Sequence, residues 1–144
     1  MIKHIHISTD PTSPNVFFMP RVYNDAMTLL NEAQDYFTKF GSDDQTKIGS
    51  SMRPLYTCEM SRITLRLSCI MSWILAQRSV LAGEIEKEES ANYGLEFDNV
   101  CRVDNKMLHG ILPSYVCYLL DSTLELYERV LRLNSMMHAS GQTA

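Results

Sequence analysis

The stretch EMSRITLRLSCIMSWILAQRSVLAGEI, residues 59–85, decides the fold. Its apolar residues recur every three or four positions, the period of one face of an α-helix. The main stripe comprises Met60, Ile63, Leu67, Ile70, Ile74, Leu81 and Ile85, and a second stripe beside it comprises Leu65, Cys69, Trp73, Ala76 and Val80. Because the two stripes cover most of the circumference, we predict a long central helix over residues 52–89 that two other helices enclose.

The two ends of this helix have recognisable signals. Ser51 suits the N-cap position, and Pro54 falls in the first turn, where the missing N–H of proline costs little. At the other end, Gly83 and the charged run over residues 84–89 offer an alternative, in which the buried part of the helix stops earlier.

A second amphipathic helix is predicted over residues 20–40 and a third over residues 114–137. The first of these begins with Pro20 and ends before Gly41, a residue type that often adopts the left-handed conformation after a helix. Its apolar positions are Val22, Ala26, Leu29, Leu30, Ala33, Phe37 and Phe40, and those of the last helix are Val116, Leu119, Leu120, Thr123, Leu124, Tyr127, Val130 and Leu131.

The remaining segments are predicted to be connections and ends. Residues 42–50 are a polar connection, and residues 92–112 are a loop rich in turn-forming residues. Within that loop, Leu95 to Val103 form either a short strand or a segment that tucks under the helices. Residues 1–19 are an irregular N-terminal arm, whose apolar residues 16–19 could pin it to the core or to a partner, and residues 138–144 are a flexible tail.

These elements predict an all-α fold, an antiparallel three-helix bundle with a long central helix, formed by one domain over residues 20–137. At the rise of an α-helix, the central helix would span about 58 Å, against about 30 Å and about 36 Å for its neighbours. One end would therefore overhang, or a second subunit would cover it, and either is compatible with a homodimer.

Composition restricts the partners and the compartment. The chain has 13 basic and 17 acidic residues and a formal net charge of -4, so we expect no nucleic acid partner. Arginines interrupt the most apolar region, so we expect no membrane span. The first twenty residues lack the pattern of a signal peptide, and the four cysteines are scattered, which favours buried reduced thiols and a cytoplasmic protein.

Two sets of residues raise the question of catalysis or metal binding. His4 and His6 could share a metal ion, but a site needs three or four ligands, so a mobile arm is the preferred interpretation. Cys101, Asp104 and His109 could form a nucleophilic site, which would require a depressed thiol pKa. We expect neither the metal site nor the nucleophilic site, and therefore predict no enzyme activity, no metal and no cofactor.

Charged side chains on the predicted helices are candidates for protein interaction. Glu59, Arg62 and Arg66 share one helical face, where they form either a docking strip or an internal ion pair. Arg129 and Arg132 lie on the predicted outer face of the last helix. Trp73 is expected to pack in the core rather than to serve as an exposed anchor, and Met136 and Met137 either fill gaps or form an adaptable binding surface.

Three segments together resemble a known family, the regulator of CtrA degradation (RcdA) family of alphaproteobacteria. They are residues 23–40, with YNDAMTLLNEAQDYF, residues 59–85, with SRITLRL, SWIL, QRSV and AGEI, and residues 126–133, LYERVLRL. They occur in the order that the family's three helices have. The loop before the third segment is this chain's own, and family members carry a longer flexible terminus than the residues after Met137 here.

The resemblance implies a fold and a function. It implies a dimeric three-helix bundle that catalyses nothing and assists the ATP-dependent protease ClpXP in cell-cycle control. The implied partners are the protease, a CpdR-like response regulator that primes it, and the substrates that the adaptor links to them. The alternative is a homodimeric helical interaction module unrelated to proteolysis.

Overall fold

The computed structural model describes residues 14–104 and 106–139, with the backbone alone for residues 14–17. Three long helices dominate: α1 (Pro14–Lys39), α3 (Arg53–Leu81) and α5 (Ser114–Ala139). Shorter elements join them: α2 (Gly41–Lys47), α4 (Asp98–Cys101) and the 3-10 turn η1 (Lys106–Leu108). The described residues contain no strand beyond an isolated bridge between His109 and Leu112, so the predicted all-α class is confirmed.

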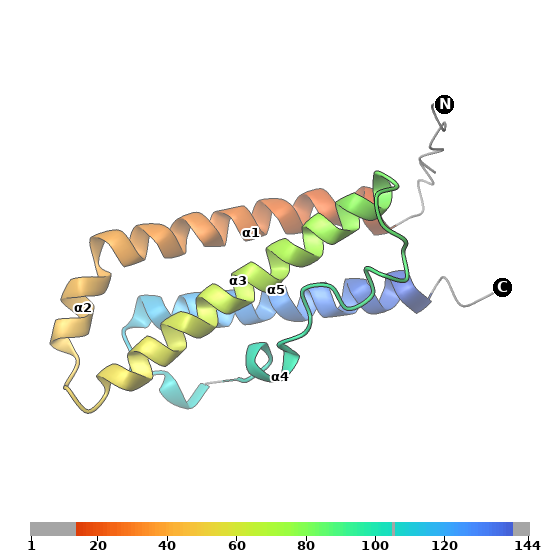
Figure 1. Cartoon of the computed structure of the whole chain (residues 1–144). Helices are drawn as coiled ribbons and strands as arrows, with labels where there is room; N and C mark the ends of the chain where they lie inside the picture. The colour runs from red at the N-terminus through yellow and green to blue at the C-terminus, as the bar shows by residue number, and fades with distance from the viewer. Residues whose placement is uncertain (1–13, 105, 140–144) are drawn as a thin grey trace.

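The directions of the long helices differ from the antiparallel arrangement that the sequence predicted. Helix α1 runs opposite to α3, since Tyr36 meets Tyr56 and Tyr23 meets Arg78. Helices α3 and α5 run in the same direction. Figure 1 shows that the connection that follows α3 returns along the length of the molecule before α5 begins. Arg66 lies beside Leu120, and Trp73, further along α3, lies beside Asn134. The connection over residues 82–113 is long enough to make this return, whereas a short connection would have forced α5 to run against α3.

Helix α3 ends earlier than the predicted residue 89, at the alternative stop near Gly83. Gly83 has a φ of 75°, its N–H donates to the carbonyl of Val80, and the N–H of Glu84 donates to the carbonyl of Ser79. This pair of bonds is the Schellman arrangement, which needs a left-handed residue at Gly83. The three long helices are consequently similar in length, with 26, 29 and 26 residues, and the predicted overhang is absent.

The first predicted helix also has different bounds. Helix α1 begins at Pro14, not at Pro20, because a first-turn proline needs no N–H partner and the added turns bury Met19. Pro20 therefore lies inside the helix on its exposed side, where it removes one backbone hydrogen bond. The rest of the predicted arm, residues 1–13, and the side chains of residues 14–17 lie outside the described part, as do residues 140–144.

The predicted polar connection over residues 42–50 contains a helix. Helix α2 has Asp43 and Asp44 in its first turn, where carboxylates stabilise the positive end of the helix dipole. The Tyr36 hydroxyl donates to Asp44 Oδ2 over 2.6 Å and ties α2 to α1. Gly41 begins α2 instead of ending the preceding helix in a left-handed conformation, and the N-cap of α3 is Met52 rather than Ser51.

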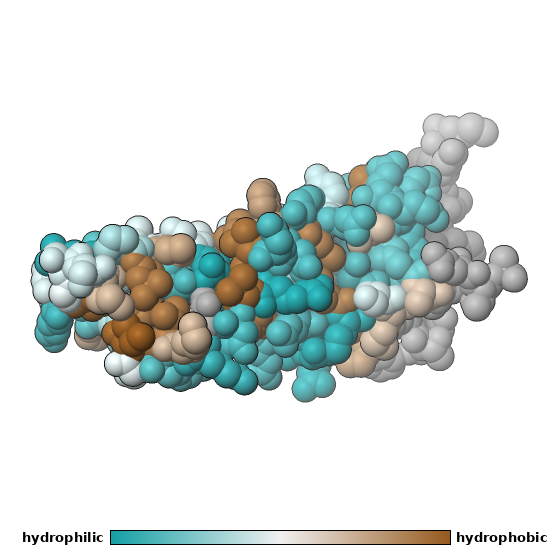
Figure 2. All heavy atoms as spheres, turned by 90° about the horizontal axis from the view of Figure 1, so that it is seen from below, coloured by the Kyte–Doolittle hydropathy of each residue, from teal (hydrophilic) through white to brown (hydrophobic). Residues whose placement is uncertain are grey.

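The core lies where α1, α3 and α5 meet. Trp73 is fully buried, as predicted, and its indole N–H donates to Asn134 Oδ1 over 3.0 Å. Figure 2 shows that apolar side chains also reach the surface, where they gather at the end of the molecule that holds α2 and the start of α5. Met107 and Ile111 are exposed apolar residues in the last part of the connection, just before α5.

Candidate functional site

The Arg66 side chain, one of the predicted docking residues, lies inside the protein. Its Nε donates to the carbonyl of Cys101 over 2.8 Å, and its Nη2 donates to the carbonyl of Val103 over 2.7 Å. Its Nη1 donates to the carbonyl of Leu120 over 2.9 Å. The Arg66 guanidinium thereby joins α3 to the connection and to α5, and burial lowers its pKa.

Glu59 and Arg62 form an ion pair with each other on the same face of α3. Both side chains are almost entirely covered, and Arg62 Nε also donates to the carbonyl of Val100 over 3.2 Å. These contacts match the internal ion pair that the sequence left open. In this conformation, Glu59 and Arg66 offer no surface to a partner, and Arg62 offers little.

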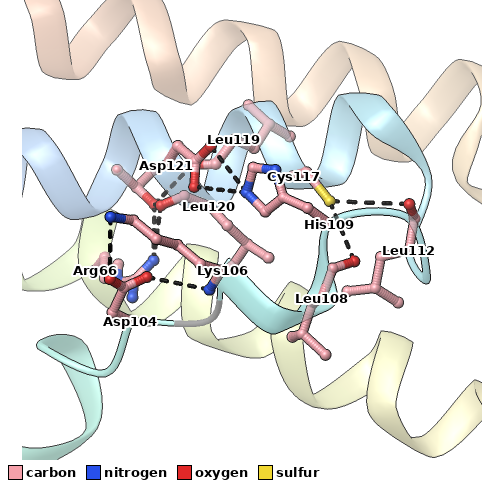
Figure 3. A network of polar contacts seen from close by, with 11 residues as sticks. Arg66, Asp104, Lys106, Leu108, His109, Leu112, Cys117, Leu119, Leu120 and Asp121 are labelled. Atoms are coloured by element: carbon pink, nitrogen blue, oxygen red, sulfur yellow. Dashed lines mark hydrogen bonds and ion pairs between the residues drawn. The ribbon is translucent and has the colours of Figure 1, made fainter.

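The residues of the hypothetical nucleophilic site lie apart. Cys101 is fully buried, and its Sγ lies 3.9 Å from Cys69 Sγ, while burial raises the pKa of the Cys101 thiol. Figure 3 shows the His109 ring turned toward Asp121 on α5, with its Nε2 3.1 Å from the carboxylate. Asp104 lies beside Lys106 in the same view. A nucleophile needs a depressed pKa and an adjacent base, and Cys101 has neither among its described contacts.

Groups of three or more potential metal ligands are absent within residues 14–104 and 106–139. The suggested pair His4 and His6 lies outside the described residues. None of the helices in the described part combines the length and the apolar character that crossing a lipid bilayer requires.

The two predicted docking residues on α5, Arg129 and Arg132, lie at the surface and border a pocket. We call it the arginine pocket, and it lies between the first turns of α1 and the last turns of α5, with a volume of about 310 Å³. It is lined by Phe18, Arg21, Val22, Arg129, Arg132, Leu133 and Met136. Arg129 pairs across the helices with Asp25.

A larger surface feature, the α1/α3 groove, lies between α1, α2 and α3. It comprises two adjoining hollows of about 780 and about 440 Å³ that share Phe37, Thr64 and Ser68. Short hydroxyl side chains follow one face of α3 there at helical spacing, and apolar side chains flank them: Thr57, Ser61, Thr64 and Ser68, with Leu30, Met60, Leu65 and Met71. None of the described residues that line the groove carries a charge.

Sequence reasoning missed two residues that α1 contributes, Arg21 in the arginine pocket and Phe37 in the groove. Phe37 was assigned to the buried stripe of its helix, yet it is 37 % exposed. Arg21 lies next to the predicted helix start, and no sequence pattern marks it as a site residue, because only the fold brings it to the end of α5. An excess of apolar positions on the predicted helix was the one available signal for an uncovered face.

The chain matches one protein family and is similar to a protein of known structure. A family model described as "Protein of unknown function (DUF1465)" matches residues 12–144. Among solved structures, the chain is similar to RcdA from Caulobacter crescentus CB15, with a TM-score of 0.62 and 27 % sequence identity. That match covers 83 % of this chain and 90 % of the other. No curated protein matches the sequence.

Proposed function

Because this chain belongs to the DUF1465 family, the family of RcdA, we propose that it is a non-enzymatic adaptor that assists regulated proteolysis. In this proposal, it links substrates to the ClpXP protease, after a CpdR-like response regulator has primed the protease, and acts in the cytoplasm in cell-cycle control. The observation that carries the proposal is the similarity to RcdA over most of both chains.

The described surface suits protein binding better than catalysis. It offers an uncharged groove and an arginine-rimmed pocket, whereas the buried thiols and the Arg66 network are engaged within the fold. Interfaces are enriched in aromatic residues, methionine and arginine, and the lining includes Phe37, Met60 and Met71 in the groove and three arginines with Phe18 and Met136 in the pocket.

A reconstituted degradation assay tests the proposal. Purified ClpXP, a CpdR-like regulator and a candidate substrate are combined with and without the full chain, and substrate loss is followed on gels. We expect the chain to accelerate substrate loss and to be retained by immobilised ClpX or by the regulator. Unchanged degradation, together with retention by neither protein, would contradict the proposal.

The alternative, a homodimeric interaction module unrelated to proteolysis, is favoured by the α1/α3 groove. An uncharged groove of this size is suited to burial against another uncharged surface, and a second copy of the chain supplies one.

Light scattering on the wild type and on Phe37→Asp tests this alternative. The matched control is Phe40→Asp, since Phe40 is 58 % exposed and does not line the groove. A dimer that Phe37→Asp dissociates and Phe40→Asp leaves intact supports the groove as the dimer surface. A monomeric wild type at high micromolar concentration excludes the homodimer.

A further inference from the structure

The arginine pocket combines an apolar floor with a charged rim. Val22 and Leu133, only 1 % and 6 % exposed, form its floor, whereas Phe18 and Met136 stand at its mouth with 41 % and 52 % exposure. Its volume is near the lower limit for ligand pockets, about 300 Å³, so it suits a single large apolar side chain better than an extended ligand. Methionine and phenylalanine at the mouth give such a side chain adaptable contacts.

The rim carries more positive charge than its neighbours neutralise. Arg129 is paired with Asp25, but no ion pair within the described residues includes Arg21 or Arg132. Both of these arginines are exposed. The two guanidinium groups therefore retain their capacity to bind carboxylates, in a chain whose net charge is -4.

We propose that the arginine pocket binds an acidic segment of a partner protein in which large apolar side chains lie between carboxylates and one of them fills the pocket. The apolar side chain enters the floor between α1 and α5, and Arg21 and Arg132 bind the flanking carboxylates through their planar forks. This inference rests on the proposed adaptor function, because it names the chemistry of the segment that the adaptor recognises.

Charge and shape together favour a peptide over nucleic acid. Binding to a phosphate backbone uses a row of cations spread over many charges, whereas the pocket offers an apolar hollow and two arginines that form no ion pair with other described residues. Arginine beside aromatic and apolar side chains is the composition of residues that dominate the affinity of protein interfaces.

The probe for the experiment is the fluorescein-labelled peptide EDELFEDL, titrated with the full chain and followed by fluorescence anisotropy. The two control peptides are QNQLFQNL, which lacks the side-chain carboxylates, and EDEAAEDA, which lacks the large apolar side chains. We expect EDELFEDL to bind, both controls to bind at least about tenfold more weakly, and added salt to weaken the binding.

The variant pair locates the site. Arg21→Glu combined with Arg132→Glu should weaken binding of EDELFEDL at least about tenfold, the cost of losing one or more charge-assisted hydrogen bonds. Arg53→Glu is the matched control, since Arg53 is exposed at the start of α3 and lines neither the pocket nor the α1/α3 groove. Equal binding by the double variant and the wild type would overturn the proposal.

A second measurement uses the wild-type chain, so it tests the proposal even if the double variant fails to fold. The peptide should shift the amide NMR resonances of the non-proline residues within 18–22 and 129–136 and leave those of the non-proline residues within 53–60 in place. Shifts elsewhere alone would overturn the proposal. So would a single-stranded DNA oligonucleotide that binds at residues 18–22 and 129–136 more tightly than the peptide.

The degradation assay separates this inference from the proposed function. If the double variant accelerates degradation as the wild type does, the pocket inference fails and the adaptor proposal survives. If the peptide binds in the pocket but the wild type does not affect degradation, the pocket stands and the adaptor proposal fails.

Discussion

The Arg66 side chain joins three separate parts of the chain through carbonyl groups. It is 1 % exposed, and it bonds to Cys101 and Val103 of the connection and to Leu120 of α5. Removing a buried donor leaves its acceptors without a partner, which costs more free energy than the bonds themselves contribute. Arg66 is thus the single side chain on which the docking of the connection depends most.

We predict that Arg66→Met lowers the free energy of unfolding by about 3–5 kcal/mol, the usual cost of removing one partner from a buried charged network. Urea unfolding followed by circular dichroism measures this change. Arg53→Met, at an exposed position, should change the free energy of unfolding by less than about 0.5 kcal/mol. A similar effect of both variants would contradict the structural role of Arg66.

The four cysteines should differ sharply in reactivity. Cys58 is exposed, whereas Cys69, Cys101 and Cys117 are buried, and burial raises the pKa of each of these three thiols. We predict that iodoacetamide at about pH 8 modifies Cys58 in the native protein and the other three only after unfolding, since the thiolate is the reactive form. Peptide mass mapping gives the site of each modification. Rapid native alkylation of Cys101 would revive the nucleophile hypothesis.

Among the elements, the connection over residues 82–113 packs closely against α3 at Gly94. A Cβ atom at Gly94 would lie 2.4 Å from the carbonyl oxygen of Cys69 and 2.8 Å from the nitrogen of Trp73, and the φ of Gly94 is 83°. Both neighbours are helix backbone atoms, which cannot move aside without breaking the helix. Only glycine allows the connection to approach α3 this closely.

We therefore predict that Gly94→Ala lowers the thermal midpoint strongly, with a loss of more than about 2 kcal/mol from backbone strain and displacement of the connection. Gly110→Ala is the matched control, because Gly110 also has a positive φ, of 90°, but has nothing within 4 Å of the added Cβ. That variant should lose only about 1 kcal/mol. Equal losses would show that the close approach at Gly94 is unimportant.

The long helices were predictable from sequence, because each buries an apolar face that repeats with the helical period. Helix α5 was placed at residues 114–137 and is observed at Ser114–Ala139. The short elements were not predictable. Helix α2 buries no residue, and α4 buries only Cys101, so neither leaves a periodic apolar pattern to detect.

The direction of α5 and the burial of Glu59, Arg62 and Arg66 depend on tertiary contacts. The loop length allowed either direction, and the parallel one is stabilised by the carbonyls of the connection, which carry no side-chain signal. The same carbonyls explain why Arg62 and Arg66 face inward, since backbone acceptors satisfy guanidinium groups that would otherwise need water, and Glu59 is held by its ion pair with Arg62. The docking role predicted for Arg129 and Arg132 stays a prediction, which the arginine pocket now makes specific.

At the scale of the whole molecule, the family resemblance expected from three segments is confirmed by the family model and by the similarity to RcdA. The three segments lie on α1, α3 and α5, the helices that form the core. The resemblance therefore lies on the helices that form the core, and the partner-binding surfaces of this chain are left to the experiments above.

Stability should fall at alkaline pH, because the core of this protein holds several weak acids in neutral form. Burial raises the pKa of Cys69 to about 12, and also raises the pKa values of Cys101, Tyr36 and Tyr127. The unfolded chain ionises its thiols first, near about pH 8.5. The stabilisation is therefore complete below that pH and is lost as the pH rises toward 12.

Urea midpoints at about pH 7, 9 and 10.5 measure this loss, and we expect a steady decrease above about pH 8.5. Cys69→Ala should reduce the steepness of the decrease by about one proton, because one buried thiol no longer titrates on unfolding. A midpoint that stays constant to pH 10.5 would show that the thiols are accessible in the folded state.

The parallel course of α3 and α5 has a kinetic consequence. Trp73 and Asn134 are 61 residues apart in sequence, and Arg66 and Leu120 are 54 apart. Forming these contacts closes large loops, and the chain loses this entropy before the contacts stabilise it. The pairing of α1 with α3 closes shorter ones, with Tyr36 and Tyr56 separated by 20 residues. We expect the α1–α3 hairpin to form first and α5 to dock last, and the chain to refold more slowly than helical proteins with short hairpin connections.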